Sequence, residues 1–168
     1  MSPEYPFVDL ALARRLETAE GHANAGFVEA RARLEPSIGA TWMTAGGALA
    51  MFDGPGSPMT QTFGLGIHEA VTDDTLETLE WFFKSRGASV CHEVSPLAGV
   101  EVYARLHARG YAPIEAASVM FRPIDAPVAG VLNPRLSVRE VTPADGDAYT
   151  ATVVKGWSEF PAAQPFLE

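Results

Sequence analysis

The sequence contains a single cysteine, Cys91, among its 168 residues. One thiol cannot form a disulfide within the chain, so folds held by disulfides are excluded and we expect a reducing, cytoplasmic compartment. Basic residues are also scarce, with 12 Lys and Arg against 21 Asp and Glu and a formal net charge of −9. Phosphate and anionic lipid surfaces are bound through clustered Lys and Arg, so we expect neither a nucleic-acid nor a membrane partner.

Long apolar segments are missing as well. Residues 1–4 lack the basic start of a secretory signal, and no long apolar run follows them. The longest uncharged segment, residues 36–52, is interrupted by Gly46-Gly47 and is short for a membrane span. With 47% hydrophobic residues, the chain is instead expected to bury a core as a water-soluble protein.

Residues 62–122 alternate strand-like apolar runs with helical patterns. The predicted order is strand, helix, strand, helix and strand, over residues 62–67, 72–87, 88–94, 95–110 and 119–121. In the first helix Thr72 or Asp74 is the expected N-cap and Gly87 the C-terminal stop. The expected buried faces of the two helices are Leu76, Leu79, Phe82 and Phe83, and Leu97, Val100, Tyr103 and Leu106. This alternation indicates an α/β fold with at least one parallel crossover.

Upstream of this stretch the sequence predicts two helices and a hairpin. Apolar residues at helical spacing indicate one helix over residues 8–19 and a second over 27–34, separated at Glu20-Gly21. Residues 40–44 and 49–52 are two apolar runs on either side of Gly46-Gly47, which is the pattern of a β-hairpin. The whole sheet is therefore expected to be mixed, with helices on its faces.

Downstream, residues 125–135 have two prolines and no helical period, and we interpret them as a linker. Residues 136–141 alternate apolar and polar like a strand, and Thr142-Pro143-Ala144-Asp145 is typical of a helix start. The helix is expected to end near Trp157. The predicted organisation is thus a domain over 1–124, a linker over 125–135, and the first strand and helix of a second domain over 136–168.

Few residue patterns point to chemistry directly. The four histidines are far apart in sequence with no metal-ligand spacing, so no metal site is predicted. Gly64-x-Gly66 is too short for a dinucleotide fingerprint and indicates close backbone packing or a bulge. His92 and Glu93 end a predicted strand, and such ends often face a ligand crevice in α/β sheets. Ordinary polar residues at a strand end remain the alternative explanation.

The element order resembles the GNAT acetyltransferase superfamily, in which two helices precede three antiparallel strands, a helix, a parallel strand, another helix and a final strand. Residues 102–111, VYARLHARGY, are similar to the signature of the superfamily's second helix, which ends in glycine and an aromatic. Residues 136–145 resemble the opening strand and helix start of such a domain. The arrangement resembles the N-terminal part of tandem GNAT proteins, with a first domain that lacks its first strand.

The resemblance implies acetyl-CoA as cofactor and an amine of a small molecule or peptide as acceptor, and two departures bear on activity. Active GNAT domains hold the coenzyme pyrophosphate on a Gln/Arg-x-x-Gly-x-Gly/Ala loop, whereas residues 67–74 here read IHEAVTDD, without glycine and with three carboxylates. At about 6 Å and an effective dielectric near 20, two like charges repel by roughly 3 kcal/mol before screening. The superfamily's usual acid, a tyrosine, corresponds to Leu106.

Three hypotheses follow. In the first, residues 1–124 are a non-catalytic GNAT-like domain of an acetyl-CoA-dependent N-acetyltransferase whose active copy is expected beyond Glu168. In the second, this domain is itself catalytic, with Glu93 as base and Tyr103, one turn before Leu106, as acid. In the third, the chain is a non-enzymatic binding or dimerisation module, because the strand over 136–141 is able either to complete the sheet of the first domain or to pair with another chain.

Overall fold

A tight hairpin forms the centre of the sheet. The computed structural model describes residues 8–122 and 133–159. Strands β1 (Thr41–Ala45) and β2 (Ala48–Phe52) pair antiparallel, with Ala45 opposite Ala48. Gly46 and Gly47 both have positive φ angles, of 54° and 71°, as a two-residue turn of type I′ requires. The hairpin predicted from the sequence is therefore confirmed.

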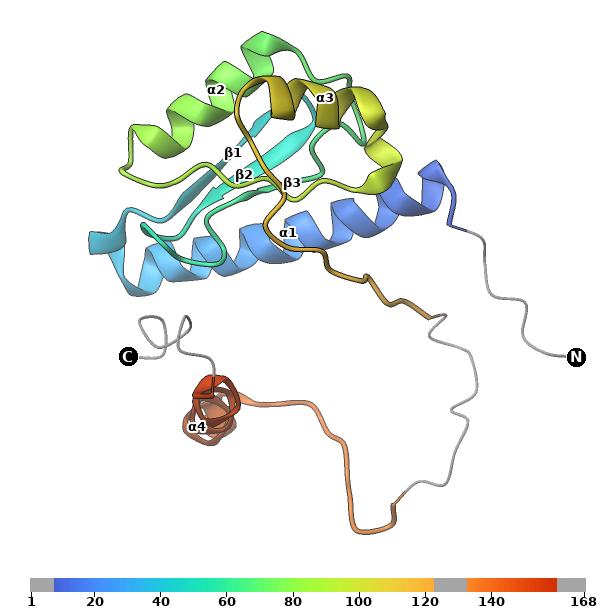
Figure 1. Cartoon of the computed structure of the whole chain (residues 1–168). Helices are drawn as coiled ribbons and strands as arrows, with labels where there is room; N and C mark the ends of the chain where they lie inside the picture. Colours follow the sequence, from blue (N-terminus) through green and yellow to red (C-terminus); the bar gives the residue numbers. More distant parts are fainter. Residues whose placement is uncertain (1–7, 123–132, 160–168) are drawn as a thin grey trace, which may run out of the picture. The chain divides into compact units, whose positions relative to one another are not determined.

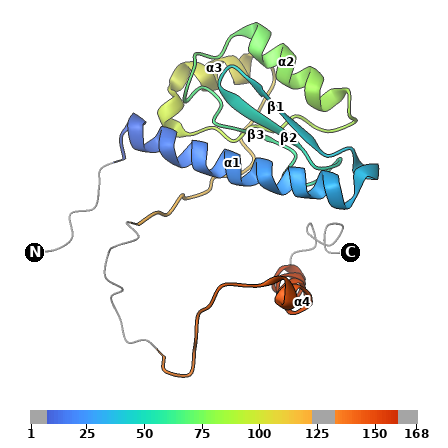
Figure 2. The same cartoon turned by 180° about the vertical axis from the view of Figure 1, so that it is seen from behind.

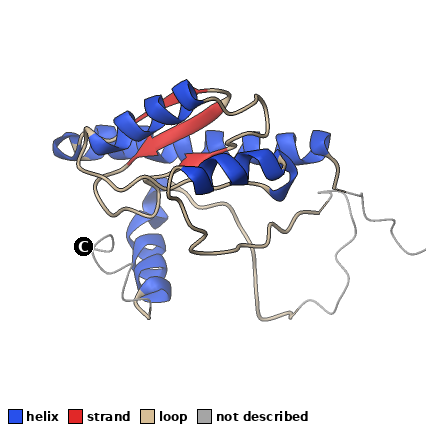
Figure 3. Cartoon of the chain, turned by 45° about the horizontal axis from the view of Figure 1, so that its top comes forward, coloured by secondary structure: helices blue, strands red, loops and turns tan. Residues whose placement is uncertain are grey.

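The sheet changes from antiparallel to parallel pairing at its third strand. β3 (Thr62–Phe63) pairs antiparallel with β2, giving the order β1-β2-β3 (Figure 3). On its other side the backbone of Thr62 bonds to Cys91 and Glu93, which makes a parallel bridge between Thr62 and His92. The predicted strands over 62–67 and 88–94 are thus present only as two residues and one bridge. The positive φ angles of Gly64 and Gly66 curl the chain after Phe63 and end β3.

Helices cover both faces of this sheet, and β2 supplies side chains to both cores. Helix α1 (Leu10–Leu34) runs along one face, and α2 (Asp73–Lys84) and α3 (Val100–Ala108) lie on the other (Figures 1 and 2). Because successive strand residues point to opposite faces, Ala48, Ala50 and Phe52 pack on the α2 side. Leu49 and Met51 pack on the α1 side. The mixed α/β class is confirmed.

Helix α1 is continuous over 25 residues, so the prediction of two helices separated at Glu20-Gly21 was wrong. Gly21 is buried, and a Cβ placed on it would lie 3.3 Å from Leu49 Cδ1. The glycine therefore lets the helix approach β2 closely and does not end it. The helix ends at Leu34, before the 3₁₀ turn Pro36–Ile38, as the proline predicts.

The second helix has its predicted cap and buried face, whereas the third begins later than predicted and buries a different face. In α2 the hydroxyl of Thr72 accepts from the amide of Thr75, and all four predicted core residues are buried. Before α3, a 3₁₀ turn (Pro96–Ala98) ends at Gly99, and the helix begins only at Val100. That interruption changes which side faces the core. Val102 and Leu106 are buried, whereas Val100 is 83% exposed.

The chain divides into two units, the first ending at Ile114 and the second starting at Glu115. In the second unit, helix α4 (Gly146–Trp157) follows a 3₁₀ turn (Pro143–Asp145), and Thr142 and Asp145 form the predicted capping box. The strands predicted over 119–121 and 136–141 are absent, because neither segment has a neighbour to complete a ladder. Most of the predicted linker falls in residues 123–132, outside the described residues. The boundaries at 124 and 135 stay predictions.

Candidate functional site

Tyr103 bonds to the residue that follows Glu93 at the end of the parallel bridge. The Glu93 amide donates to the Thr62 carbonyl at 2.8 Å, which fixes the backbone beside β3. One residue further along, the carbonyl of Val94 accepts a hydrogen bond of 3.0 Å from the Tyr103 hydroxyl on α3. The two candidates predicted from the sequence therefore come from neighbouring segments. The phenol is engaged with backbone, and it lies 43% exposed.

A carboxyl group that sequence reasoning missed lies beside this tyrosine. Glu17 on α1 has its Oε2 atom buried without a hydrogen-bond partner. Burial raises the pKa of Glu17, repulsion by Glu20 adds to the rise, and hydrogen bonding to the Gly64 backbone opposes it. The pKa of Tyr103 is raised by burial first and by the charge of Glu17 second. A phenol and a carboxyl group of raised pKa are both capable of proton exchange.

The sequence did contain a signal for Glu17. The buried residues of α1 include Ala13, Gly21 and Ala25, and Glu17 falls on the same stripe, four residues after Ala13 and four before Gly21. A carboxylate in an otherwise small and apolar stripe is unusual, since burying a charge without a partner is costly. The prediction of two separate helices concealed this stripe, because it placed Gly21 at a break.

The turn after β3 lies with Glu17 and Tyr103 in one group of side chains, which we call the Glu17 cluster. His68 Nε2 lies 3.4 Å from the Thr18 hydroxyl, and Arg14 Nε donates to the Ile67 carbonyl at 2.8 Å, so both side-chain contacts tie the turn to α1. A Cβ on Gly66 would lie only 2.6 Å from Val102 Cγ2. The close packing predicted for Gly64-x-Gly66 is confirmed at Gly66.

The N-terminus of α2 is where the resemblance would put a pyrophosphate. Here the Thr72 hydroxyl caps the helix, and Asp73 and Asp74 occupy its first turn. Asp73 also ion-pairs with Arg105 at 3.5 Å and Arg109 at 3.8 Å. The helix dipole and the nearby guanidinium groups are therefore already offset by carboxylates of the chain. These residues do not fit a bound pyrophosphate.

A second polar network joins α2 to the end of α3. Glu80 accepts hydrogen bonds from Arg109 Nε at 2.8 Å, Lys84 Nζ at 2.9 Å and the Tyr111 hydroxyl at 3.2 Å. The bond from Arg109 is the main reason that the pKa of Glu80 falls to about 2. Each partner of the Glu80 carboxylate is a cation or a hydroxyl whose hydrogen bond the carboxylate accepts. We therefore interpret Glu80, Lys84, Arg109 and Tyr111 as a structural clamp between α2 and the end of α3.

His92 lies next to this clamp. Its ring is tilted against Tyr111 with centroids 5.1 Å apart, and both ring nitrogens are buried without hydrogen-bond partners. Burial lowers the pKa of His92 to about 4, although Glu80 opposes the shift. The enclosed imidazole of His92 is therefore neutral near pH 7. Within residues 8–122 and 133–159, no three His, Cys, Asp or Glu side chains gather closely enough to hold a metal ion.

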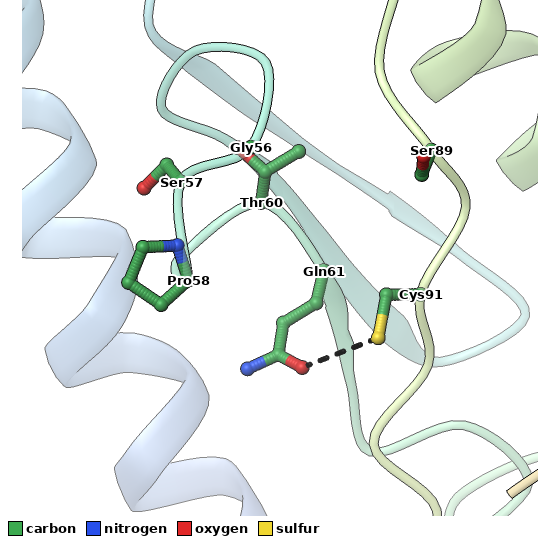
Figure 4. A pocket seen from close by; sticks show the side chains of 7 residues that line it. All are labelled: Gly56, Ser57, Pro58, Thr60, Gln61, Ser89 and Cys91. Atoms are coloured by element: carbon green, nitrogen blue, oxygen red, sulfur yellow. Dashed lines mark hydrogen bonds between the residues drawn. The ribbon is translucent and has the colours of Figure 1, made fainter. Parts of the chain in front are cut away.

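A small cavity of about 190 Å³ adjoins the start of β3 (Figure 4). Cys91 and Gln61 face each other across it, with the thiol donating to Gln61 Oε1 at 3.9 Å. The other lining residues are Gly56, Ser57, Pro58, Thr60 and Ser89. Since Gln61 precedes β3 and the Gly64 turn follows it, this cavity and the Glu17 cluster adjoin opposite ends of the strand.

Comparisons with known proteins leave the family open. No protein-family model matches the chain, and neither a curated protein nor a solved structure matches it significantly. Among the described residues, no helix has the length and apolar character needed to cross a bilayer. What the chain does must therefore be argued from its fold and its own side chains.

Proposed function

We propose that the chain is a GNAT-like, non-catalytic part of an acetyl-CoA-dependent N-acetyltransferase that transfers acetyl to an amine. The parallel bridge between Thr62 and His92 carries this proposal. Antiparallel strands β1, β2 and β3 are followed by helix α2 and a return in parallel beside β3, and then by helix α3. This is the order of elements in the superfamily, apart from one long helix in place of two and no final strand in the described residues.

The chemistry at the start of α2 supports the non-catalytic assignment. A coenzyme pyrophosphate would approach Glu69, Asp73 and Asp74, and it would compete with Asp73 for the two arginines of α3. The hydroxyl of Tyr103 is directed to the Val94 carbonyl, so its proton is committed to backbone. In this proposal the coenzyme binds to another part of the parent protein, and the present domain braces that part or shapes the acceptor pocket.

Thermal unfolding with and without millimolar acetyl-CoA tests the assignment. We expect no shift for the 168-residue chain. A ligand at about a hundred times its dissociation constant adds roughly 2.7 kcal/mol, or several degrees for a domain of this size. A saturable shift would overturn the non-catalytic assignment, and Glu93→Gln and Tyr103→Phe would then test the two candidate catalytic groups.

Charge-neutral variants sharpen the same experiment. If the acidic loop is the obstacle, the triple variant Glu69→Gln, Asp73→Asn and Asp74→Asn should bind acetyl-CoA detectably. The matched control removes three charges from exposed residues elsewhere, Glu101→Gln, Glu115→Gln and Asp147→Asn. Binding of acetyl-CoA by both triple variants would show that the net charge of the chain, and not the acidic loop, prevents binding in the wild type. Binding by neither would indicate that the loop backbone, without glycine, also excludes the coenzyme.

The acetyltransferase part of the proposal is tested on a longer parent chain. Such a chain should release free thiol from acetyl-CoA when an amine acceptor is supplied. It should also contain a Gln/Arg-x-x-Gly-x-Gly stretch outside residues 1–168, where the helix N-terminus is free to hold the pyrophosphate. A parent chain without that stretch would contradict the proposal.

The second candidate function is a binding or assembly module. One observation favours it: none of the described residues from 133 to 159 is buried. A helix with Tyr149 and Trp157 more than half exposed normally covers its apolar residues by contact with another surface.

A further inference from the structure

The outer edge of β1 has unpaired backbone groups. β1 is the outermost strand of the sheet, and its hairpin turn has two residues, so Ala45 and Ala48 form a hydrogen-bonded pair. Hydrogen-bonded and non-hydrogen-bonded pairs alternate along an antiparallel ladder. The N–H and C=O groups of Trp42 and Thr44 therefore point away from β2. No backbone hydrogen bond among the described residues reaches them from outside.

An unpaired edge of this kind is a template for another strand. Natural edges are often protected by charges, prolines or bulges, and the sequence of β1, TWMTA, contains neither a charge nor a proline. Thr44 is exposed, and Met43 and Ala45 are only partly buried against the core on the α2 side. An added strand would thus find free backbone groups and also an apolar surface to extend.

The second unit contains a segment with the matching pattern. Residues 136–141, LSVREV, alternate apolar and polar as far as Arg139, and the segment is similar in length to β1, which has five residues. Leu136 is 75% exposed and Val138 is 100% exposed, and the segment belongs to no strand. Its C-terminal side is held to the following helix, because Arg139 donates to both carboxylate oxygens of Asp145 and the amide of Thr142, the N-cap, donates to the same carboxylate.

We propose that the chain forms a homodimer in which residues 136–141 of one copy pair with the outer edge of β1 in the second copy. Leu136 and Val138 share one face of an extended strand, so both are able to continue the apolar surface of Met43 and Ala45. Reciprocal exchange between two copies closes the assembly with two-fold symmetry and covers both open edges. The anchored corner at Asp145 brings α4, with its exposed Tyr149 and Trp157, to the same interface.

Sedimentation velocity of the full 168-residue chain over a range of concentrations tests the dimer. We expect a monomer–dimer equilibrium whose dissociation constant rises by about tenfold or more in Thr44→Pro and in Val138→Pro, because proline removes an N–H and obstructs the added ladder. The Thr44 N–H points away from β2, so Thr44→Pro removes no bond of the hairpin. Ala117→Pro, in an exposed stretch without regular structure, is the control and should dimerise normally.

Cross-linking identifies the partner even where a proline variant folds poorly. In a Cys91→Ser background, Thr44→Cys is placed in one copy and Ser137→Cys or Val141→Cys in the other, because these side chains would lie on the Thr44 face of the extended sheet when Leu136 and Val138 lie on the face of Met43 and Ala45. A disulfide between the two kinds of copy after mixing is the expected result. A cross-link only within a doubly substituted monomer would overturn the exchange in favour of a segment that pairs with its own sheet. Cross-links only between two Thr44→Cys copies would show that the dimer forms by pairing of β1 with β1 instead. A monomer without any cross-link would refute the proposed dimer.

Discussion

The two units of the chain differ in where their hydrogen bonds and burial come from. In the unit that ends at Ile114, side chains bond over long sequence separations, as from Arg14 to Ile67 and from Arg109 to Glu80. In the second unit, side chains bond over short separations, as from Arg139 to Asp145, six residues away. Among residues 8–122 and 133–159, all buried core residues belong to the first unit. The first unit is therefore stabilised by tertiary packing, whereas residues 139–157 of the second are held by local caps and helix bonds.

The largest expected effect comes from a matched pair of aromatic substitutions. Phe83 is fully buried in the core on the α2 side, whereas Tyr149 on α4 is 58% exposed. Phe83→Ala should lower the free energy of unfolding by about 3 to 5 kcal/mol, because it removes a large side chain from a packed core. Tyr149→Ala should change it by less than about 0.5 kcal/mol. Urea unfolding measures both, and equal losses would contradict the division into two units.

The next effect is a pH dependence specific to the first unit. The pKa of His92 is about 4 in the folded protein and near 6.5 in the unfolded chain. Between these values the unfolded state takes up the proton and the folded state does not, so stability falls as the pH falls through 6.5. At about 1.36 kcal/mol per unit, the loss reaches roughly 2 kcal/mol at pH 5.

Urea unfolding between pH 7.5 and 5 measures this slope in the wild type and in His92→Gln. The variant should lose it, while His107→Gln, which removes an exposed histidine, should keep it. Glu80 does not contribute in this window, because its lowered pKa stabilises the fold above pH 4.5 and is lost only as the pH falls toward 2. An unchanged slope in His92→Gln would mean that another group titrates.

A smaller loss is expected from the clamp between α2 and α3. Glu80→Gln keeps the shape of the side chain but removes the charge that Arg109, Lys84 and Tyr111 share. Guanidinium unfolding should show a loss of about 1 to 2 kcal/mol, as for charge-assisted bonds at a partly buried site. Glu77→Gln on the exposed side of α2 is the control and should have little effect. Equal losses would assign the effect to general charge and not to the clamp.

Local signals in the sequence predicted local structure correctly. They failed where an element forms only by contact with a segment that is distant in the sequence. The Gly46-Gly47 turn, the Thr72 cap and the box at Thr142 and Asp145 all depend on neighbours within a few residues, and each is present. A strand over 136–141 needs a second strand for its ladder, which the pattern LSVREV cannot supply. The residues of the Glu17 cluster were missed for the same reason, since α1, the turn after β3 and α3 meet only in the folded chain.

The smallest expected effect on global stability comes from Arg139→Ala. This substitution removes the two bonds to Asp145 that hold the start of α4, while Thr142 keeps its own bonds to the same carboxylate. Carbon chemical shifts of residues 143–157 should report a loss of helix in the first turn, and the unfolding midpoint of the first unit should stay unchanged. A shift in that midpoint would mean that the second unit is energetically coupled to the first.

In the proposed dimer such coupling should increase with protein concentration, because the segment next to Arg139 would then complete the sheet of the other copy. If Arg139→Ala shifts the unfolding midpoint of the first unit only at high protein concentration, the two units are coupled through the dimer. If the midpoint never shifts, the two units are energetically independent.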